Sequence, residues 1–317
     1  MASITTESRR HRLQTSALEE SVGKKSPIPM LNAIEEIRSD PIARQFEIGA
    51  LLFAQFACPA QEVGVWTETD YLMHVVSGTT SFTIADHALS VRAGEAVFVT
   101  KGAYFIPAHS NGDPCVQLYF IPDASVRETI SGLAVDISAA WGRAPGAEGV
   151  MRVVEEPALS AFFRAMAVYF AADEAPPEAL LTLKLRELLT GILLSQKNSE
   201  LSLYLQSIAA SDAPSLPAIM EANWDHNLPL AAFARLCHRS LSSFKRDFHK
   251  HYGQTPARWL LERRLERSFS LLRATRKSVT EIMLECGFED LSHFSRAFKQ
   301  KFGHSPSARR RAAVTTS

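Results

Sequence analysis

The sequence from Ser278 to Arg311, SVTEIMLECGFEDLSHFSRAFKQKFGHSPSARRR, predicts a short helix, a turn, a second helix and a basic segment. Ser278 and Glu281 have the spacing of a capping box, which marks the start of the first helix. Gly287 can adopt the positive φ that ends this helix. Asp290 is a good N-cap for the second helix. The stretch therefore predicts a helix-turn-helix.

The second of these helices has two different faces. Four apolar side chains recur at helical spacing: Leu291, Phe294, Phe298 and Phe302. The opposite face holds Ser292, Arg296 and Lys299, with Ser295 beside them. A helix with aromatics on one side and hydrogen-bond donors on the other suits a DNA major groove. It also fits an ordinary amphipathic helical hairpin, so this stretch alone leaves both interpretations open.

The same pattern occurs a second time upstream, in LPLAAFARLCHRSLSSFKRDFHKHYGQTP beginning at Leu228. Phe244, Arg246 and Gly253 precede Phe294, Arg296 and Gly303 by a constant 50 positions. Cys237 likewise precedes Cys286, by 49 positions, so the second turn is one residue longer. Two helix-turn-helix units, each closed by Gly-x-[Ser/Thr]-Pro, favour a tandem DNA-binding protein over a hairpin.

From about Ser215 to Arg311 the chain resembles the AraC/XylS family of transcriptional regulators. The resemblance implies two recognition helices in successive major-groove segments on one face of DNA. The joining helix would run from Pro256 to Arg273 and span roughly 27 Å, compatible with insertions about one DNA turn, roughly 34 Å, apart. The chain departs from the family at His238, where the first turn usually has a glycine; we expect a stiffer turn there.

The helical wheel and the resemblance together predict the DNA-binding side chains. These are Ser242, Lys245, Arg246, His249, Ser292, Ser295, Arg296 and Lys299. Arg246 and Arg296 are the strongest candidates for reading bases, because a guanidinium can bond to guanine O6 and N7 together. The alternative is that both clamp phosphates. Lys299 and the three arginines of 309–311 are expected to meet phosphate.

Charge is distributed unevenly along the chain, although the net charge is zero. From Leu228 onward there are 18 Lys+Arg and 7 Asp+Glu, which leaves 34 − 18 = 16 basic and 34 − 7 = 27 acidic residues before it. The basic part is the one that resembles a DNA binder, as neutralisation of phosphates requires. The acidic part is not expected to touch DNA.

In the acidic part, short runs of strand-forming residues are separated by turn residues, which is typical of β structure. Strand candidates are Phe46–Phe56, Tyr71–Ser77, Thr80–Ala85, Ala88–Arg92, Ala96–Thr100 and Cys115–Ile121. Six short strands predict a small barrel or jelly roll. The segment VRAGEAVFVTKGAYFIPAHS resembles a cupin half-motif, which implies a cupin-like β-barrel acting as the sensor.

A cupin can also be a metal enzyme, which is the alternative to a sensor. The region offers His74, while Tyr104 stands near the place of a later histidine, and one histidine cannot hold such a metal. The four cysteines show no metal-binding spacing and are expected to be reduced. We therefore predict no catalytic residue, no metal and no cofactor. The metal enzyme fused to a DNA-binding domain remains the alternative, as does a helical module that binds no DNA.

Helical segments follow the strands, with a leucine stripe between Glu178 and Gln196. Packing against the barrel and a dimer contact both explain this stripe. The predicted organisation is a disordered leader at 1–30, a sensor and dimerisation domain at 31–200, a linker at 201–214 and an all-α DNA-binding domain at 215–312. The fold class is thus α+β with two domains.

The sequence predicts a sequence-specific, cytoplasmic transcriptional regulator. The resemblance implies an activator, because activation is the commoner mode in the family. Its expected partners are double-stranded promoter DNA, RNA polymerase and an effector, which is a small molecule or a regulatory protein; a homodimer is possible. The AGEAVFVTKGAY strand and the LKLRELL helix are similar to those of type III secretion activators, in which protein partners exert control. No apolar run is long enough to span a bilayer.

Overall fold

The computed structural model describes residues 30–58, 61–84, 87–108, 113–133, 149–210 and 215–315. The chain divides into two compact units within helix α10: one is Pro29–Trp259, and the other contains Leu260–Ser317. The predicted leader, up to residue 29, and residues 211–214 of the predicted linker lie outside the described residues. The division does not coincide with the domain boundary predicted near residue 215.

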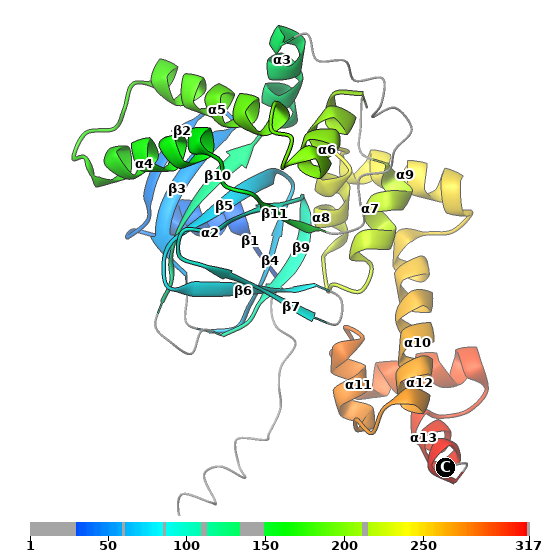
Figure 1. Ribbon diagram of the computed structural model, residues 1–317. Helices are drawn as coiled ribbons and strands as arrows, with labels where there is room; N and C mark the ends of the chain where they lie inside the picture. The colour runs from blue at the N-terminus through cyan, green and yellow to red at the C-terminus, as the bar shows by residue number, and fades with distance from the viewer. Residues whose placement is uncertain are drawn as a thin grey trace, which may run out of the picture. The chain divides into compact units, whose positions relative to one another are not determined.

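The first unit contains two β-sheets (Figure 1). One has six strands in the order β11-β8-β5-β10-β3-β2, and the other has five in the order β1-β4-β9-β6-β7. The strands are β1 (Met30–Asn32), β2 (Arg44–Ile48), β3 (Leu51–Ala57), β4 (Val63–Thr67), β5 (Asp70–Ser77), β6 (Thr79–Ile84), β7 (His87–Arg92), β8 (Ala96–Val99), β9 (Gly102–Ile106), β10 (Cys115–Ile121) and β11 (Val150–Val153). β1 pairs with β4 in parallel, and the other pairs are antiparallel.

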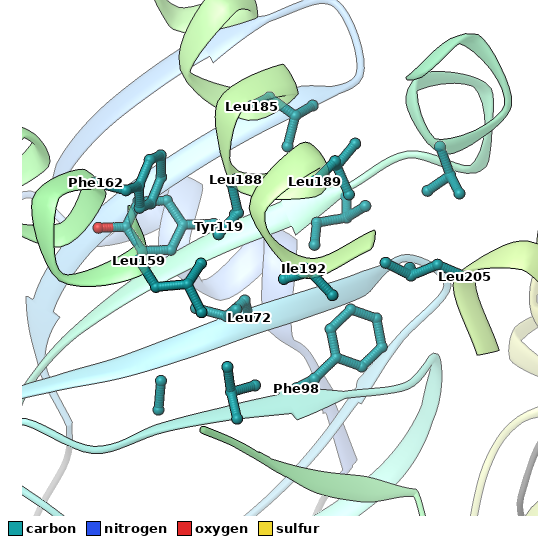
Figure 2. Packing of buried hydrophobic residues seen from close by; sticks show 14 of the residues in the cluster. Leu72, Phe98, Tyr119, Leu159, Phe162, Leu185, Leu188, Leu189, Ile192 and Leu205 are labelled. Carbon is teal, nitrogen blue, oxygen red and sulfur yellow. The ribbon is translucent and has the colours of Figure 1, made fainter. Parts of the chain in front are cut away.

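The six-stranded sheet buries both of its faces. Alternate side chains of a strand point to opposite faces. One set packs under helices α3 (Asp123–Leu133), α4 (Pro157–Ala171), α5 (Glu178–Leu193) and α6 (Ser199–Ala210). Figure 2 shows Leu188 and Ile192 of α5 near Leu72 and Tyr119 of the sheet. The other set, including Met73 and Leu118, packs with side chains of the five-stranded sheet.

The predicted cupin-like barrel is not what the described residues form: the N-terminal part is β-rich, but its two sheets are not closed into a barrel. Turn signals indicated where strands end, but not which strands pair. Two apolar faces also require a cover on each side, and here a helical layer supplies one of them. The single strand predicted over Phe46–Phe56 is a hairpin of β2 and β3, because Gly49 turns the chain at φ 58°.

The helical layer also differs from the sequence prediction. The strand β11, over Val150–Val153, was not among the predicted strands; it pairs with β8, and the first helix after it starts at Pro157. Residues 201–210, expected to be linker, belong to α6, whose Leu205 is fully buried. Helix α6 therefore extends through residue 210 of the segment predicted as linker.

The C-terminal part is helical and contains both helix-turn-helix units, as predicted. The first comprises α8 (Leu230–Leu236) and α9 (Leu241–Tyr252), preceded by α7 (Leu216–Asn223). The joining helix α10 runs over Pro256–Ala274, one residue beyond the prediction. The second unit comprises α11 (Val279–Glu285) and α12 (Leu291–Phe302), followed by α13 (Pro306–Thr315). A short helix, α2 (Ala33–Ser39), follows β1.

Candidate nucleic-acid interface

The local signals of the second helix-turn-helix act as predicted. The Ser278 hydroxyl accepts a hydrogen bond from the Glu281 N–H at 3.2 Å, and the Glu281 carboxylate accepts one from the Ser278 N–H at 2.6 Å. This reciprocal capping box satisfies two N–H groups that an isolated helix leaves unpaired. Asp290 caps α12 by accepting from the His293 N–H. Gly287 forms the turn at φ 76°.

Helix α12 is held in place by its aromatic face. Phe294 and Phe298 are 0% exposed and pack with Leu265 and Leu272 of α10 and Ile282 of α11. Burying a phenylalanine stabilises the fold by about 1.5–3 kcal/mol, so this face fixes the roll of the helix. The side of the helix that faces solvent is therefore fixed as well.

The opposite face of α12 carries the predicted side chains. Ser292, Arg296 and Lys299 are exposed, and Ser295 is partly exposed. The Arg296 Nε donates to the Ser292 carbonyl at 3.3 Å, which holds the guanidinium close to the helix surface. The four residues lie together on one helix, and their donors face away from the buried stripe.

Helix α9 repeats this arrangement in the first helix-turn-helix. Ser240 caps it by accepting from the Ser243 N–H at 3.3 Å, and Phe244 and Phe248 are 0% exposed. The predicted side chains on its other face are all exposed: Ser242, Lys245, Arg246 and His249. The Arg246 side chain is 75% exposed and lies 3.4 Å from Asp247.

Two of the arginines expected to meet phosphate have contacts within the protein. Arg310 of α13 donates to the Leu272 carbonyl at 2.9 Å and also bonds the carbonyls of Thr275 and Lys277. It thereby satisfies one carbonyl in the last turn of α10 and two in the segment that follows. The Arg309 guanidinium lies 4.0 Å from the ring centroid of Phe269, in the geometry of a cation–π contact. Their sequence gave no sign of these roles, because the partners lie more than thirty positions away.

Sequence reasoning also missed the side chains that brace the two turns. In the first turn Arg239 donates to the Cys237 carbonyl at 2.9 Å and to Asp247 at 3.1 Å. In the second, Arg264 of α10 donates to the Gly287 carbonyl at 3.3 Å. These contacts tie each turn to a neighbouring helix. The only available signal was the opposite charge of Arg239 and Asp247, which is too common to single out.

The histidine singled out in the β-rich part is packed among other side chains. His74 Nδ1 lies 3.4 Å from Gln117 Oε1, and its ring stacks on Phe163 at 4.1 Å. Burial lowers the pKa of His74. Over the described ranges, no three His, Cys, Asp or Glu residues are grouped so that they could hold a metal ion.

The four cysteines are free thiols, and Cys237 and Cys286 are buried at equivalent places of the two repeats. Burial raises the pKa of Cys237 to about 11 and that of Cys286 to about 12. Both therefore stay protonated and pack as small apolar side chains. Within the described part of the chain, no helix has the length and apolar character needed to cross a membrane.

Two helix-turn-helix units, each presenting donors opposite a buried aromatic face, together with a β-rich N-terminal part define a DNA-binding transcriptional regulator. Comparison with known proteins agrees. Residues 233–312 match a helix-turn-helix domain model, and residues 70–204 match the model of the ExsA N-terminal regulatory domain. The chain belongs to the AraC family of transcriptional regulators.

Individual relatives cover most of the chain. The thermoregulatory protein LcrF of Yersinia pestis is 25% identical over 249 residues, which are 78% of this chain and 91% of LcrF. The HTH-type transcriptional regulator ExsA of Pseudomonas aeruginosa is 24% identical over 229 residues, 71% of this chain and 80% of ExsA. Among solved structures, ToxT from Vibrio cholerae is 13% identical with a TM-score of 0.38, covering 82% of this chain and 97% of ToxT.

Proposed function

We propose that this regulator activates transcription by binding promoter DNA in a sequence-specific manner through α9 and α12. The observation that carries the proposal is the same in both helices: a fully buried phenylalanine pair fixes the roll, and a row of donors stays exposed on the far side. Activation is supported by relatives that are named as activators, such as VirF of Yersinia enterocolitica and RhaS of Escherichia coli.

Within this proposal each predicted side chain has a role. Arg246 and Arg296 read guanine, and the smaller donors Ser242, Ser292 and Ser295 contact neighbouring base edges. Of the remaining exposed side chains, Lys299 contacts phosphate, and Lys245 and His249 contact phosphate or base edges.

The test begins with selection of bound sequences from a random DNA pool by the full-length protein. Arg296→Ala is then measured on the selected site and on its single-base variants. We expect a loss of about 1–3 kcal/mol on the selected site and a relaxed preference at one base pair. Lys299→Ala is the matched control, and it should weaken all sequences alike and lower the salt slope by about one. If Arg296→Ala weakens every site by the same factor, the arginine is a phosphate clamp.

The N-terminal part receives the regulatory signal in this proposal, from a small molecule or a regulatory protein, and the DNA-bound form contacts RNA polymerase in the cytoplasm. The match of residues 70–204 to a regulatory domain supports this role. The domains proposed are a sensor at 31–200 and a DNA-binding domain at 215–312. The protein acts by binding and not by catalysis.

Self-association is also part of the proposal. Leu185 and Leu188 belong to the leucine stripe of α5, and they lie in the core at 3% and 0% exposure. Large apolar side chains exposed on the outside of this layer include Val168 of α4 and Leu183 of α5, at 66% and 60% exposure. A homodimer contact through these helices would use the second pair.

A further inference from the structure

The first helix-turn-helix lies against the β-rich part of its own compact unit. Asn223, at the end of α7, is 3% exposed, and its side-chain oxygen accepts from the Ala103 N–H of β9 at 2.9 Å. Three residues further on, the His226 ring stacks on Phe105 of β9 at 5.4 Å. The chain is thus fixed to the five-stranded sheet immediately before α8 begins.

One arginine of α8 joins this helix to the acidic N-terminal part. Arg235 donates to Glu68 at 2.7 Å and to Glu35 at 3.1 Å. Its guanidinium also lies 5.0 Å from the ring centroid of Trp66, which is 6% exposed. The hydrogen bond that Arg235 donates to Glu68 is the main reason that the pKa of Arg235 is raised. Arg235 therefore has two carboxylates and an aromatic face as partners.

Arg235 lies on the helix that would cross the DNA backbone. In helix-turn-helix proteins the first helix of the unit crosses the DNA backbone, while the second enters the major groove. A guanidinium binds carboxylate and phosphate with the same forked geometry. The docked arrangement leaves the base-facing side of α9 exposed, including Arg246. It nevertheless occupies Arg235 and sets two negative charges beside α8.

The contact has the features of one that can open. The Arg235 side chain is 44% exposed and Glu35 is 61% exposed, and ion pairs exposed to this degree are weak. The second oxygen of Glu68 is buried without a hydrogen-bond partner in the described part of the chain. A buried carboxylate oxygen without a partner opposes the docked state. Opening the contact would return this oxygen to water.

We propose that Glu35 and Glu68 hold Arg235 in place of DNA phosphates, so that docking of α8 on the N-terminal part weakens DNA binding by the first helix-turn-helix. Release of α8 frees Arg235 for the DNA backbone. The inference rests on the proposed function, since it requires that this unit bind DNA. It supplies a route by which a signal in the N-terminal part reaches the DNA-binding helices.

The test compares variants of the full-length protein in which one carboxylate is neutralised, on a mixed-sequence duplex of about 40 base pairs, roughly four helical turns. Glu68→Gln and Glu35→Gln remove one carboxylate each. Glu36→Gln is the matched control, because Glu36 is exposed on the same helix and makes the same change in net charge. Beyond the effect of the control, we expect each variant to bind about two- to fivefold more tightly. The salt slope should also steepen by about one, as Arg235 gains a phosphate.

The second arm repeats these variants in an Arg235→Gln background, where the extra gain should disappear. Thermal melts followed by circular dichroism verify that every variant is folded. If Glu68→Gln and Glu35→Gln match Glu36→Gln in affinity and slope, or if their gain persists without Arg235, the docking inference is wrong while DNA binding stands. If the folded, unsubstituted protein binds no duplex even at low salt, the proposed function itself fails.

Discussion

His238 and Gly287 occupy the same place in the two helix-turn-helix units, and both residues have positive φ, 52° and 76° respectively. Gly287 has a second reason to lack a side chain, because a Cβ there would lie 3.3 Å from the Arg264 guanidinium carbon. In the first turn the His238 ring hydrogen-bonds the backbone of Glu68. The turn in which histidine replaces the family's glycine is thus the one whose side chain makes a hydrogen bond.

Gly287→Ala should lower the free energy of unfolding by about 1–2 kcal/mol, because alanine is strained in the left-handed region and its methyl group crowds Arg264. His238→Gly removes the same strain and also a hydrogen bond, so its net effect should be smaller than about 1 kcal/mol. Urea unfolding followed by circular dichroism measures both. Equal destabilisation by the two substitutions would contradict this explanation.

Arg310 should be a stabilising residue and not a DNA contact. Arg310→Met removes charged hydrogen bonds to the end of α10 and should lower the free energy of unfolding by about 1.5–3 kcal/mol. Arg276→Met is the control, since Arg276 is exposed, and it should change stability by less than about 0.5 kcal/mol. Differential scanning calorimetry gives both values. A stable Arg310→Met variant with a lower salt slope for DNA would restore the phosphate role.

Two leucines of α5 should separate core packing from self-association. Leu188 is fully buried, and Leu188→Ala should destabilise the N-terminal part by about 2–5 kcal/mol. Leu183 is 60% exposed, so Leu183→Ser should leave the melting temperature nearly unchanged while lowering the mass seen by light scattering. A Leu183→Ser protein with unchanged mass would remove this face from the proposed dimer contact.

Asp70 should make stability depend on pH. It is 0% exposed, accepts from the Lys101 N–H at 2.6 Å and from the Tyr204 hydroxyl at 2.9 Å, and burial raises its pKa from 3.8 to about 6. The folded state therefore favours the protonated carboxyl. Its stabilising contribution is full below about pH 4 and is lost as pH rises through about 6, a change of about 3 kcal/mol.

Asp70→Asn tests this directly, because asparagine keeps an acceptor for Lys101 and offers an N–H to Tyr204 without carrying charge. Relative to the unsubstituted protein, the variant should gain stability between pH 4 and pH 7, by up to about 3 kcal/mol. Denaturant unfolding at several pH values measures the difference. A difference that does not change with pH would show that Asp70 does not titrate as described.

The sequence by itself determined the helix-turn-helix units, because their signals are local. A capping box at Ser278, a turn glycine at Gly287 and phenylalanines at helical spacing act within one or two turns of chain. The periodicity also separates the donor face of each recognition helix from its core face. The eight predicted DNA-binding residues could be named for that reason, although their contacts with bases stay a prediction.

Only the tertiary structure decided what depends on distant partners. Strand alternation shows that a strand has two faces, but not that a helical layer covers one of them, nor that the two sheets are not closed into a barrel. In the sequence, Arg310 and Arg235 cannot be told apart from the other basic residues around each of them. Their partners, Leu272 and Glu35, are 38 and 200 positions away, and no local pattern encodes a contact made by folding over such a separation.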